Sequence, residues 1–141
     1  MIASAVRVLH IEDDAAVRTS IGALLHSAGI ETRSAPDAER AIAFVREGFR
    51  PDVLIVDFNL PGELDGSDVA EEICHWVGHP IPIILLSGEL TNAAVPWVPG
   101  APLFCVWKPV DPEVLLEVVG SFATLGRSIC AREARLAALE P

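Results

Sequence analysis

The sequence has no tyrosine, one methionine and one lysine, and aromatic residues make up only 6% of its 141 residues. Basic residues are few: ten Lys and Arg stand against twenty Asp and Glu, so the net charge is −10. A domain that binds duplex nucleic acid needs the opposite balance, because Lys and Arg neutralise the phosphates. We therefore expect this chain to make no direct contact with nucleic acid.

Long hydrophobic runs are also missing. Purely apolar stretches are short, such as residues 81–86, whereas a helix that crosses a bilayer needs roughly 20 apolar residues. The acidic residues 12–14 follow the amino terminus too soon for a secretory signal. These absences predict a cytoplasmic protein without a membrane partner.

Cysteine is scarce, and its spacing gives no metal or disulfide framework. Cys74, Cys105 and Cys130 are odd in number, far apart and without a Cys-x-x-Cys pair. We interpret them as small hydrophobic residues in a reducing compartment, with a disulfide as a poor second choice. His75 and His79 have helical i, i+4 spacing, but no second pair of zinc ligands is evident, so two solvated helix residues are the favoured interpretation.

What the chain does have is the composition of one folded domain, with 51% hydrophobic and 21% charged residues. Apolar runs predict strands at residues 6–11, 30–34, 53–57, 83–87 and 103–107. Apolar residues at helical spacing predict helices from the acidic run to residue 28 and at 36–48, 66–77 and 110–125. Pro36 and Pro112 should lie in the first turns of their helices, with Asp111 as an N-cap.

This alternation of strands and helices predicts parallel strands joined by right-handed crossovers. Between residues 87 and 103 the chain contains two glycines and three prolines, which would interrupt a long helix. The fourth helix should therefore be short or irregular. We expect an α/β fold: a single doubly wound sheet of five parallel strands with helices on both faces.

Polar side chains follow four of the predicted strands: Glu12, Asp13 and Asp14 after the first, Asp57 at the end of the third, Ser87 at the end of the fourth, and Lys108 after the fifth. In an open α/β sheet the ligand site lies beyond the carboxyl ends of the strands. Carboxylates that converge there repel each other unless a cation intervenes, and Mg²⁺ prefers oxygen ligands. Lys108, the chain's single lysine, is a compact charge suited to a phosphoryl oxygen or a carboxylate.

With these motifs, residues 6–125 resemble the response-regulator receiver domain of two-component signalling, in particular its chemotaxis-regulator type. Glu12 and Asp13 resemble the family's acidic pair, and Asp57 its phosphoacceptor. Asn59 matches the residue whose main-chain carbonyl completes the metal site. The resemblance implies a flavodoxin-like fold with strand order 2-1-3-4-5.

The resemblance extends to the ends of the fourth and fifth strands. Ser87 with the small Gly88 matches the family's hydroxyl residue and its neighbour, and Lys108 followed by Pro109 matches a Lys-Pro pair whose peptide bond is typically cis. Ser87 and Lys108 would then bind phosphoryl oxygens. Inward movement of Ser87 would carry the signal to the face of the domain beyond it.

The resemblance also implies a mechanism. Asp57 would accept a phosphoryl group from a histidine kinase or a histidine phosphotransfer protein. Mg²⁺ would be held by Asp13, Asp57 and the carbonyl of Asn59, with Glu12 orienting the ion indirectly. Such a domain is not an enzyme, since it promotes only its own phosphorylation and dephosphorylation, and it signals to a downstream target by protein–protein contact.

Two features depart from the family pattern. Cys105 stands three residues before Lys108, where relatives carry an aromatic residue that moves with the hydroxyl switch. The loop after Pro61 is one residue longer than typical, next to the expected metal site. We expect intact phosphorylation chemistry with atypical signal output.

After a receiver domain at residues 1–125, residues 126–141 form a short tail that could extend the last helix. Apolar residues from Leu115 to Leu139 follow heptad spacing, broken by Arg132, which would suit a homodimer. Gly120 and Gly126 favour the alternative, a helix that ends near residue 125 and then frays. Whether the domain stands alone or is cut from a hybrid kinase stays open.

Two other functions share part of this residue pattern. A haloacid-dehalogenase-type phosphatase also uses Asp, Ser or Thr, Lys and Mg²⁺ in this order, but it needs a second Asp where Asn59 stands. The stronger rival is a receiver fold that docks partners without being phosphorylated. The altered switch position favours this docking module, and the complete set of site residues opposes it.

Overall fold

The computed structural model describes residues 5–58, 66–88 and 98–139. Its elements, in chain order, are β1 (Arg7–Ile11), α1 (Ala15–Ser27), β2 (Glu31–Ala35), α2 (Ala38–Arg46), β3 (Val53–Asp57), α3 (Gly66–Val77), β4 (Ile83–Ser87), β5 (Leu103–Trp107) and α4 (Pro112–Ala138). The predicted bounds of β3, α3, β4 and β5 are confirmed, and β2 lies one residue later than predicted. The short or irregular helix predicted after β4 falls mainly on residues 89–97, outside the described residues.

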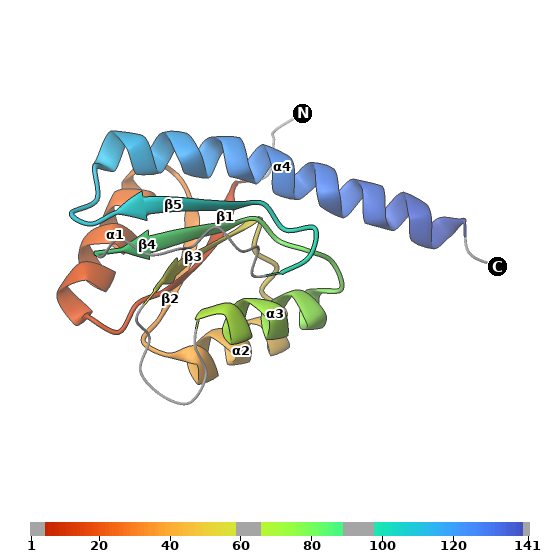
Figure 1. Cartoon of the computed structure of the whole chain (residues 1–141), viewed down its shortest axis with the longest axis horizontal. Coiled ribbons are helices and arrows are strands. Elements are labelled where there is room, and N and C mark those ends of the chain that lie inside the picture. The colour runs from red at the N-terminus through yellow and green to blue at the C-terminus, as the bar shows by residue number, and fades with distance from the viewer. Residues whose placement is uncertain (1–4, 59–65, 89–97, 140–141) are drawn as a thin grey trace.

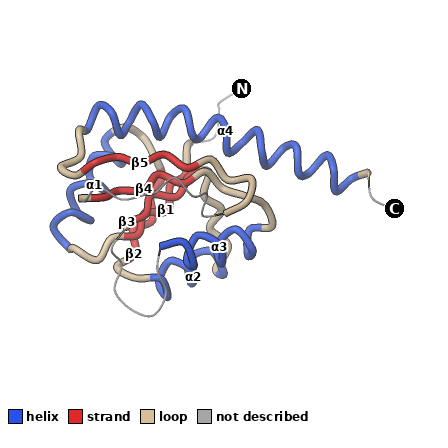
Figure 2. The backbone as a smooth tube through the Cα atoms, in the orientation of Figure 1, coloured by secondary structure: helices blue, strands red, loops and turns tan. Residues whose placement is uncertain are grey.

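The five strands form one parallel sheet in the order β2-β1-β3-β4-β5, which confirms the predicted fold class and strand order. The inner strands β3 and β4 are buried along their whole length, as their uniformly apolar sequences require. The edge strands β2 and β5 combine exposed residues with half-buried and buried ones. Helices lie on both sides of the sheet (Figure 2).

Each face of the sheet packs a separate hydrophobic core. One core lies under α2 and α3, and the other under α1 and α4. Successive side chains of β3 enter opposite cores: Leu54 and Val56 enter the first, and Val53 and Ile55 the second. Because helices cover both faces of the sheet, a ligand can reach polar side chains only at the ends of the strands.

The start of α2 differs from the prediction that Pro36 occupies its first turn. Asp37 is the N-cap, and its carboxylate accepts a hydrogen bond of 2.8 Å from the Arg40 amide. Pro36 therefore precedes the helix. A capping carboxylate satisfies one of the unpaired amides of the first turn, which a proline cannot do.

The prediction that the last helix ends near residue 125 is wrong. α4 begins as predicted, with Asp111 as N-cap and Pro112 in its first turn, but it continues to Ala138 and projects past the sheet (Figure 1). Gly126 does not end the helix. It is buried where α4 crosses the chain just before β3, and a β-carbon there would overlap the carbonyl oxygen of Asp52. Close packing, rather than helix termination, explains this glycine.

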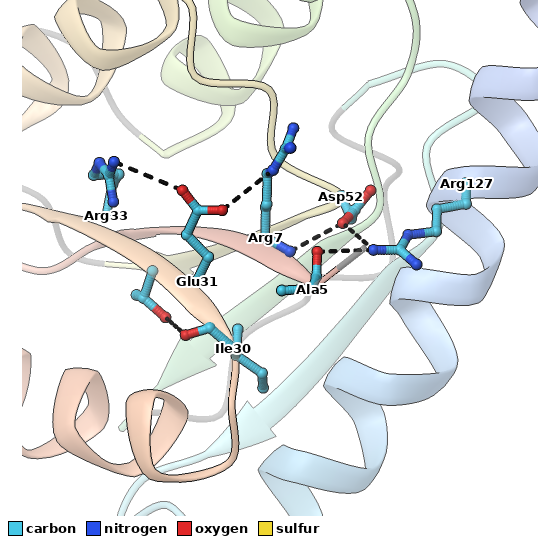
Figure 3. A network of polar contacts seen from close by, with 8 residues as sticks. Ala5, Arg7, Ile30, Glu31, Arg33, Asp52 and Arg127 are labelled. Carbon is cyan, nitrogen blue, oxygen red and sulfur yellow. Dashed lines mark hydrogen bonds and ion pairs between the residues drawn. The ribbon is translucent and has the colours of Figure 1, made fainter. Parts of the chain in front are cut away.

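An ion pair next to Gly126 fixes the crossing point of α4. The Arg127 guanidinium donates to the Ala5 carbonyl at 2.9 Å and to the Asp52 carboxylate at 3.3 Å (Figure 3). Asp52 also accepts from the Arg7 amide at 2.9 Å. Beyond this point residues 131–139 are exposed, so the predicted homodimer through this helix stays a prediction.

Within the part of the chain that the structure describes, α4 is the one helix long and apolar enough to cross a membrane by length and composition. This is weak support for a membrane span, because a core helix of a soluble domain passes the same test. Leu115, Val119 and Ala123 of α4 are buried in the domain core. The first half of α4 is thus a packing element of the domain.

Candidate functional site

Three carboxylates converge at the carboxyl edge of the sheet. Glu12 and Asp13 follow β1, and Asp57 ends β3, so the pairing of these two strands places the three residues together. One oxygen from each of the three lies within 4.8 Å of the others. Glu12 and Asp57 are buried, whereas Asp13 is exposed. Among the described residues, no other group of three His, Cys, Asp or Glu residues is close enough to hold a metal ion.

Lys108 brings the positive charge to this cluster. It follows β5 at the same edge, and its ammonium nitrogen lies 3.1 Å from Glu12 Oε1 and 3.4 Å from Asp57 Oδ1. Its amide donates to the Ser87 carbonyl at 2.8 Å, which holds it beside β4. The sequence-predicted Glu12, Asp13, Asp57 and Lys108 are therefore one constellation.

The charged groups of this cluster change the pKa values of Glu12 and Lys108. Burial, and then the neighbouring Asp57 carboxylate, raises the pKa of Glu12 to about 7. Burial alone would lower the pKa of the Lys108 ammonium, but Glu12 and Asp57 outweigh this effect and raise it. A lysine that stays charged beside two buried carboxylates is suited to receive an anionic group.

The donor set fits a magnesium ion. Glu12 Oε2 is buried and has no hydrogen-bond partner in the described structure, so this oxygen has unused acceptor capacity. The three side chains offer only carboxylate oxygens, the hard ligands that Mg²⁺ prefers. Asn59, the fourth predicted ligand, lies outside the described residues, as does the lengthened loop after Pro61.

Two contacts that were not predicted from the sequence support the acidic loop. The Asp14 carboxylate caps α1 by accepting from the amides of Ala16 and Val17. Arg18, one turn further along α1, donates through Nη1 to the carbonyls of Glu12 at 2.9 Å and Asp13 at 3.3 Å. The arginine thus fixes the main chain that carries both carboxylates. The sequence feature that could have predicted this role is an arginine one helical turn after an Asp at the N-cap position.

His10 is a further buried polar group that the sequence did not reveal as special. It lies in β1 with no exposed surface, and its Nδ1 is 3.5 Å from the Ser34 hydroxyl. Its Nε2 has no partner within the described part of the chain. Burial, together with the charge of Arg18, lowers its pKa to about 4, so the ring is neutral at physiological pH.

The predicted phosphoryl-binding residues also lie at the carboxyl edge. Ser87 is fully buried at the end of β4, and the peptide bond between Lys108 and Pro109 is cis. Gly88 is exposed, and a β-carbon there would meet nothing within 4 Å, so packing does not demand a glycine at this position. Cys105 is half-buried in β5, and burial raises the pKa of its thiol.

The remaining cysteines and histidines lie away from this cluster. Cys74 is buried and Cys130 exposed, and both are free thiols, as predicted. His75 is exposed in the last turn of α3, whereas His79 lies after the helix with Nδ1 3.0 Å from the Pro80 carbonyl oxygen. The two histidines are therefore not on one helix.

Known proteins with similar sequences point to one family. The model of the response regulator receiver domain matches residues 8–120. The DNA-binding response regulator MtrA of Mycobacterium tuberculosis is 29% identical over 110 residues, covering 78% of this chain and 47% of that protein. The transcriptional regulatory protein AfsQ1 of Streptomyces coelicolor is 33% identical over 108 residues, covering 77% of this chain and 47% of that protein. The chain spans about half the length of these relatives.

Solved structures agree with the sequence comparison. The chemotaxis protein CheY4 of Vibrio cholerae has a TM-score of 0.73 and is 26% identical, covering 84% of this chain and 99% of that chain. The family match extends over most of the domain, from β1 into α4, and includes the carboxylate cluster and Lys108. The chain belongs to the response-regulator receiver domain family.

Proposed function

We propose that this domain accepts a phosphoryl group on Asp57 in a two-component phosphorelay. The observation that carries the proposal is the position of Asp57 at the end of β3. Its carboxylate lies 3.4 Å from the Lys108 ammonium and within 4.8 Å of the Glu12 and Asp13 carboxylates. A carboxylate held beside a cation and a potential metal site is placed for nucleophilic attack on phosphorus.

In this mechanism an Asp57 oxygen forms the new bond to phosphorus, and the bond between phosphorus and the donor breaks. Lys108, already beside Asp57, pairs with a phosphoryl oxygen, and the Ser87 hydroxyl donates to another. Asp13 and Asp57 would hold Mg²⁺ together with the Asn59 carbonyl, and Glu12 would orient the ion indirectly. When bound, Mg²⁺ neutralises charge on the transferring group.

The proposed partners are a histidine kinase or histidine phosphotransfer protein and a downstream protein target. The output is contact between proteins in the cytoplasm, and the domain turns over no other substrate. MtrA is described as DNA-binding, but this chain covers only 47% of it. The net charge of −10 supports the proposal that this chain itself does not bind nucleic acid.

The test is intact-mass analysis after incubation with acetyl phosphate and Mg²⁺. We expect one phosphoryl adduct on the wild-type chain and none on Asp57→Asn or without Mg²⁺. Circular dichroism of Asp57→Asn checks that the variant is folded.

A second candidate is a docking module that works without phosphorylation. The observation that favours it is Cys105, half-buried in β5 where the family resemblance leads us to expect a switching aromatic residue. If conditions that phosphorylate a known receiver leave this chain unmodified, the docking module becomes the better explanation.

A further inference from the structure

A polar pocket lies at the amino-terminal edge of the sheet, opposite the carboxylate cluster. Its volume is about 380 Å³, within the range of small-ligand sites. Arg7 from the start of β1, Arg33 from β2, and Arg50 from the segment before β3 all line it. We call it the arginine pocket. In a chain with nine arginines and a net charge of −10, three guanidinium groups around one pocket are a marked local excess of positive charge.

The three guanidinium groups are held in position by neighbouring groups. Glu31 lies between two of them: Arg7 Nε is 3.3 Å from one carboxylate oxygen and Arg33 Nη2 is 3.7 Å from the other (Figure 3). The Arg33 guanidinium also lies 5.2 Å from the centre of the Phe49 ring. Arg50 donates through Nη1 to the Val45 and Phe49 carbonyls.

These contacts orient the arginines without using all of their donors. A guanidinium has five N–H groups, and among the described residues Arg7, Arg33 and Arg50 use only the few just named. The pocket's second carboxylate, Glu47, is paired with Arg40 at 3.7 Å. Three guanidinium groups therefore face two carboxylates, and the pocket keeps an excess of cationic donors.

We propose that the arginine pocket binds a small organic phosphate. Guanidinium groups pair with phosphate oxygens through two parallel hydrogen bonds, a geometry that lysine does not provide. Phe44 and Phe49 line the same pocket and supply apolar wall for the organic part of the ligand. The site is separate from Asp57, so it would give the domain a ligand input that does not depend on phosphorylation.

The test is an NMR titration of the full chain with AMP as the organic phosphate, with adenosine and inorganic phosphate as the two partial ligands. AMP should shift the amide signals of residues 31–33 and 44–50 and bind more tightly than either partial ligand. Arg7→Gln combined with Arg33→Gln should weaken AMP binding roughly tenfold or more, because charge-assisted hydrogen bonds are lost.

The matched control is Arg132→Gln combined with Arg135→Gln, which removes the same charge from exposed positions of α4. It should leave AMP binding unchanged, as should Asp57→Asn. The proposal is overturned if AMP leaves the amides of the arginine pocket unshifted at millimolar concentration. Equal weakening in the α4 control would also overturn it, because binding would then follow net charge alone. If inorganic phosphate binds as tightly as AMP, the pocket does not recognise the organic part of the ligand, and the proposal of an organic phosphate is refuted.

Discussion

His10 should make the domain lose stability as the pH falls. The side chain is fully buried in β1, and burial together with the charges of Arg18 and Lys108 disfavours the protonated ring. Its pKa is lowered from 6.5 to about 4 in the folded chain. The unfolded chain therefore binds a proton at a pH where the folded chain does not. The free energy of unfolding should fall as the pH drops below 6.5, and this loss should level off below about 4.

The size of the effect follows from these two pKa values. Linkage gives about 2 kcal/mol of lost stability between pH 7.5 and pH 5, and about 3 kcal/mol once the pH is well below 4. Water does not reduce this effect by screening, because the His10 ring has no exposed surface. A loss of this size is a large fraction of the 5–15 kcal/mol typical of a folded domain.

The assay is urea unfolding at pH 7.5 and pH 5, followed by circular dichroism, for wild type and His10→Leu. Buried carboxylates such as Glu12 titrate in both proteins, so the difference between their pH slopes isolates the histidine. We expect the wild type to lose about 2 kcal/mol more than His10→Leu over this range. Equal slopes for wild type and His10→Leu would refute the argument, because the buried ring would then not resist protonation.

Four further substitutions test the crossing of α4 and the carboxylate cluster. Gly126→Ala should destabilise the domain by roughly 1–3 kcal/mol in urea unfolding, since its β-carbon would overlap the Asp52 carbonyl oxygen. A β-carbon at Gly120 would meet nothing within 4 Å, so Gly120→Ala should instead stabilise the domain by up to about 1 kcal/mol. If both substitutions destabilise the domain or both stabilise it, the close-packing explanation of Gly126 is contradicted. Arg18→Met should weaken Mg²⁺ binding about tenfold in calorimetry, because the Glu12 and Asp13 carbonyls lose their donor; unchanged affinity would remove Arg18 from the site. Lys108→Met should slow the phosphorylation of Asp57 by acetyl phosphate roughly hundredfold, as followed by intact mass. Phosphorylation of this variant at the wild-type rate would show that Lys108 does not assist phosphoryl transfer.

Local patterns in the sequence were sufficient to predict the sheet. β3 and β4 are uniformly apolar because both of their faces are covered, and runs of this kind can be recognised without tertiary information. Glu12, Asp57 and Lys108 could be placed together because parallel strands end at the same edge. The order of the strands followed from the family resemblance.

Three of the missed features depend on residues that are far apart in the sequence. Gly126 looks like a helix breaker until its contact with Asp52, 74 positions earlier, is known. His10 looks like an ordinary strand residue until the burial of its ring is known. The arginine pocket combines residues from β1, β2 and the chain after α2, and no local motif predicts that they meet.

The two edges of the sheet should act independently on simple electrostatic grounds. Strand β1 carries Arg7 at one end and is followed by Glu12 at the other, and its five residues span about 17 Å. This distance is about twice the screening length of roughly 8 Å at physiological ionic strength. Because Glu12 and Asp57 are buried, part of the anion's field reaches them through the protein, and two unit charges at this distance interact by roughly 1 kcal/mol at an effective dielectric constant of about 20. An anion in the arginine pocket should therefore change the Mg²⁺ affinity of the carboxylate cluster by less than about tenfold, and calorimetry with and without AMP measures this directly. A larger change would require that β1 itself moves.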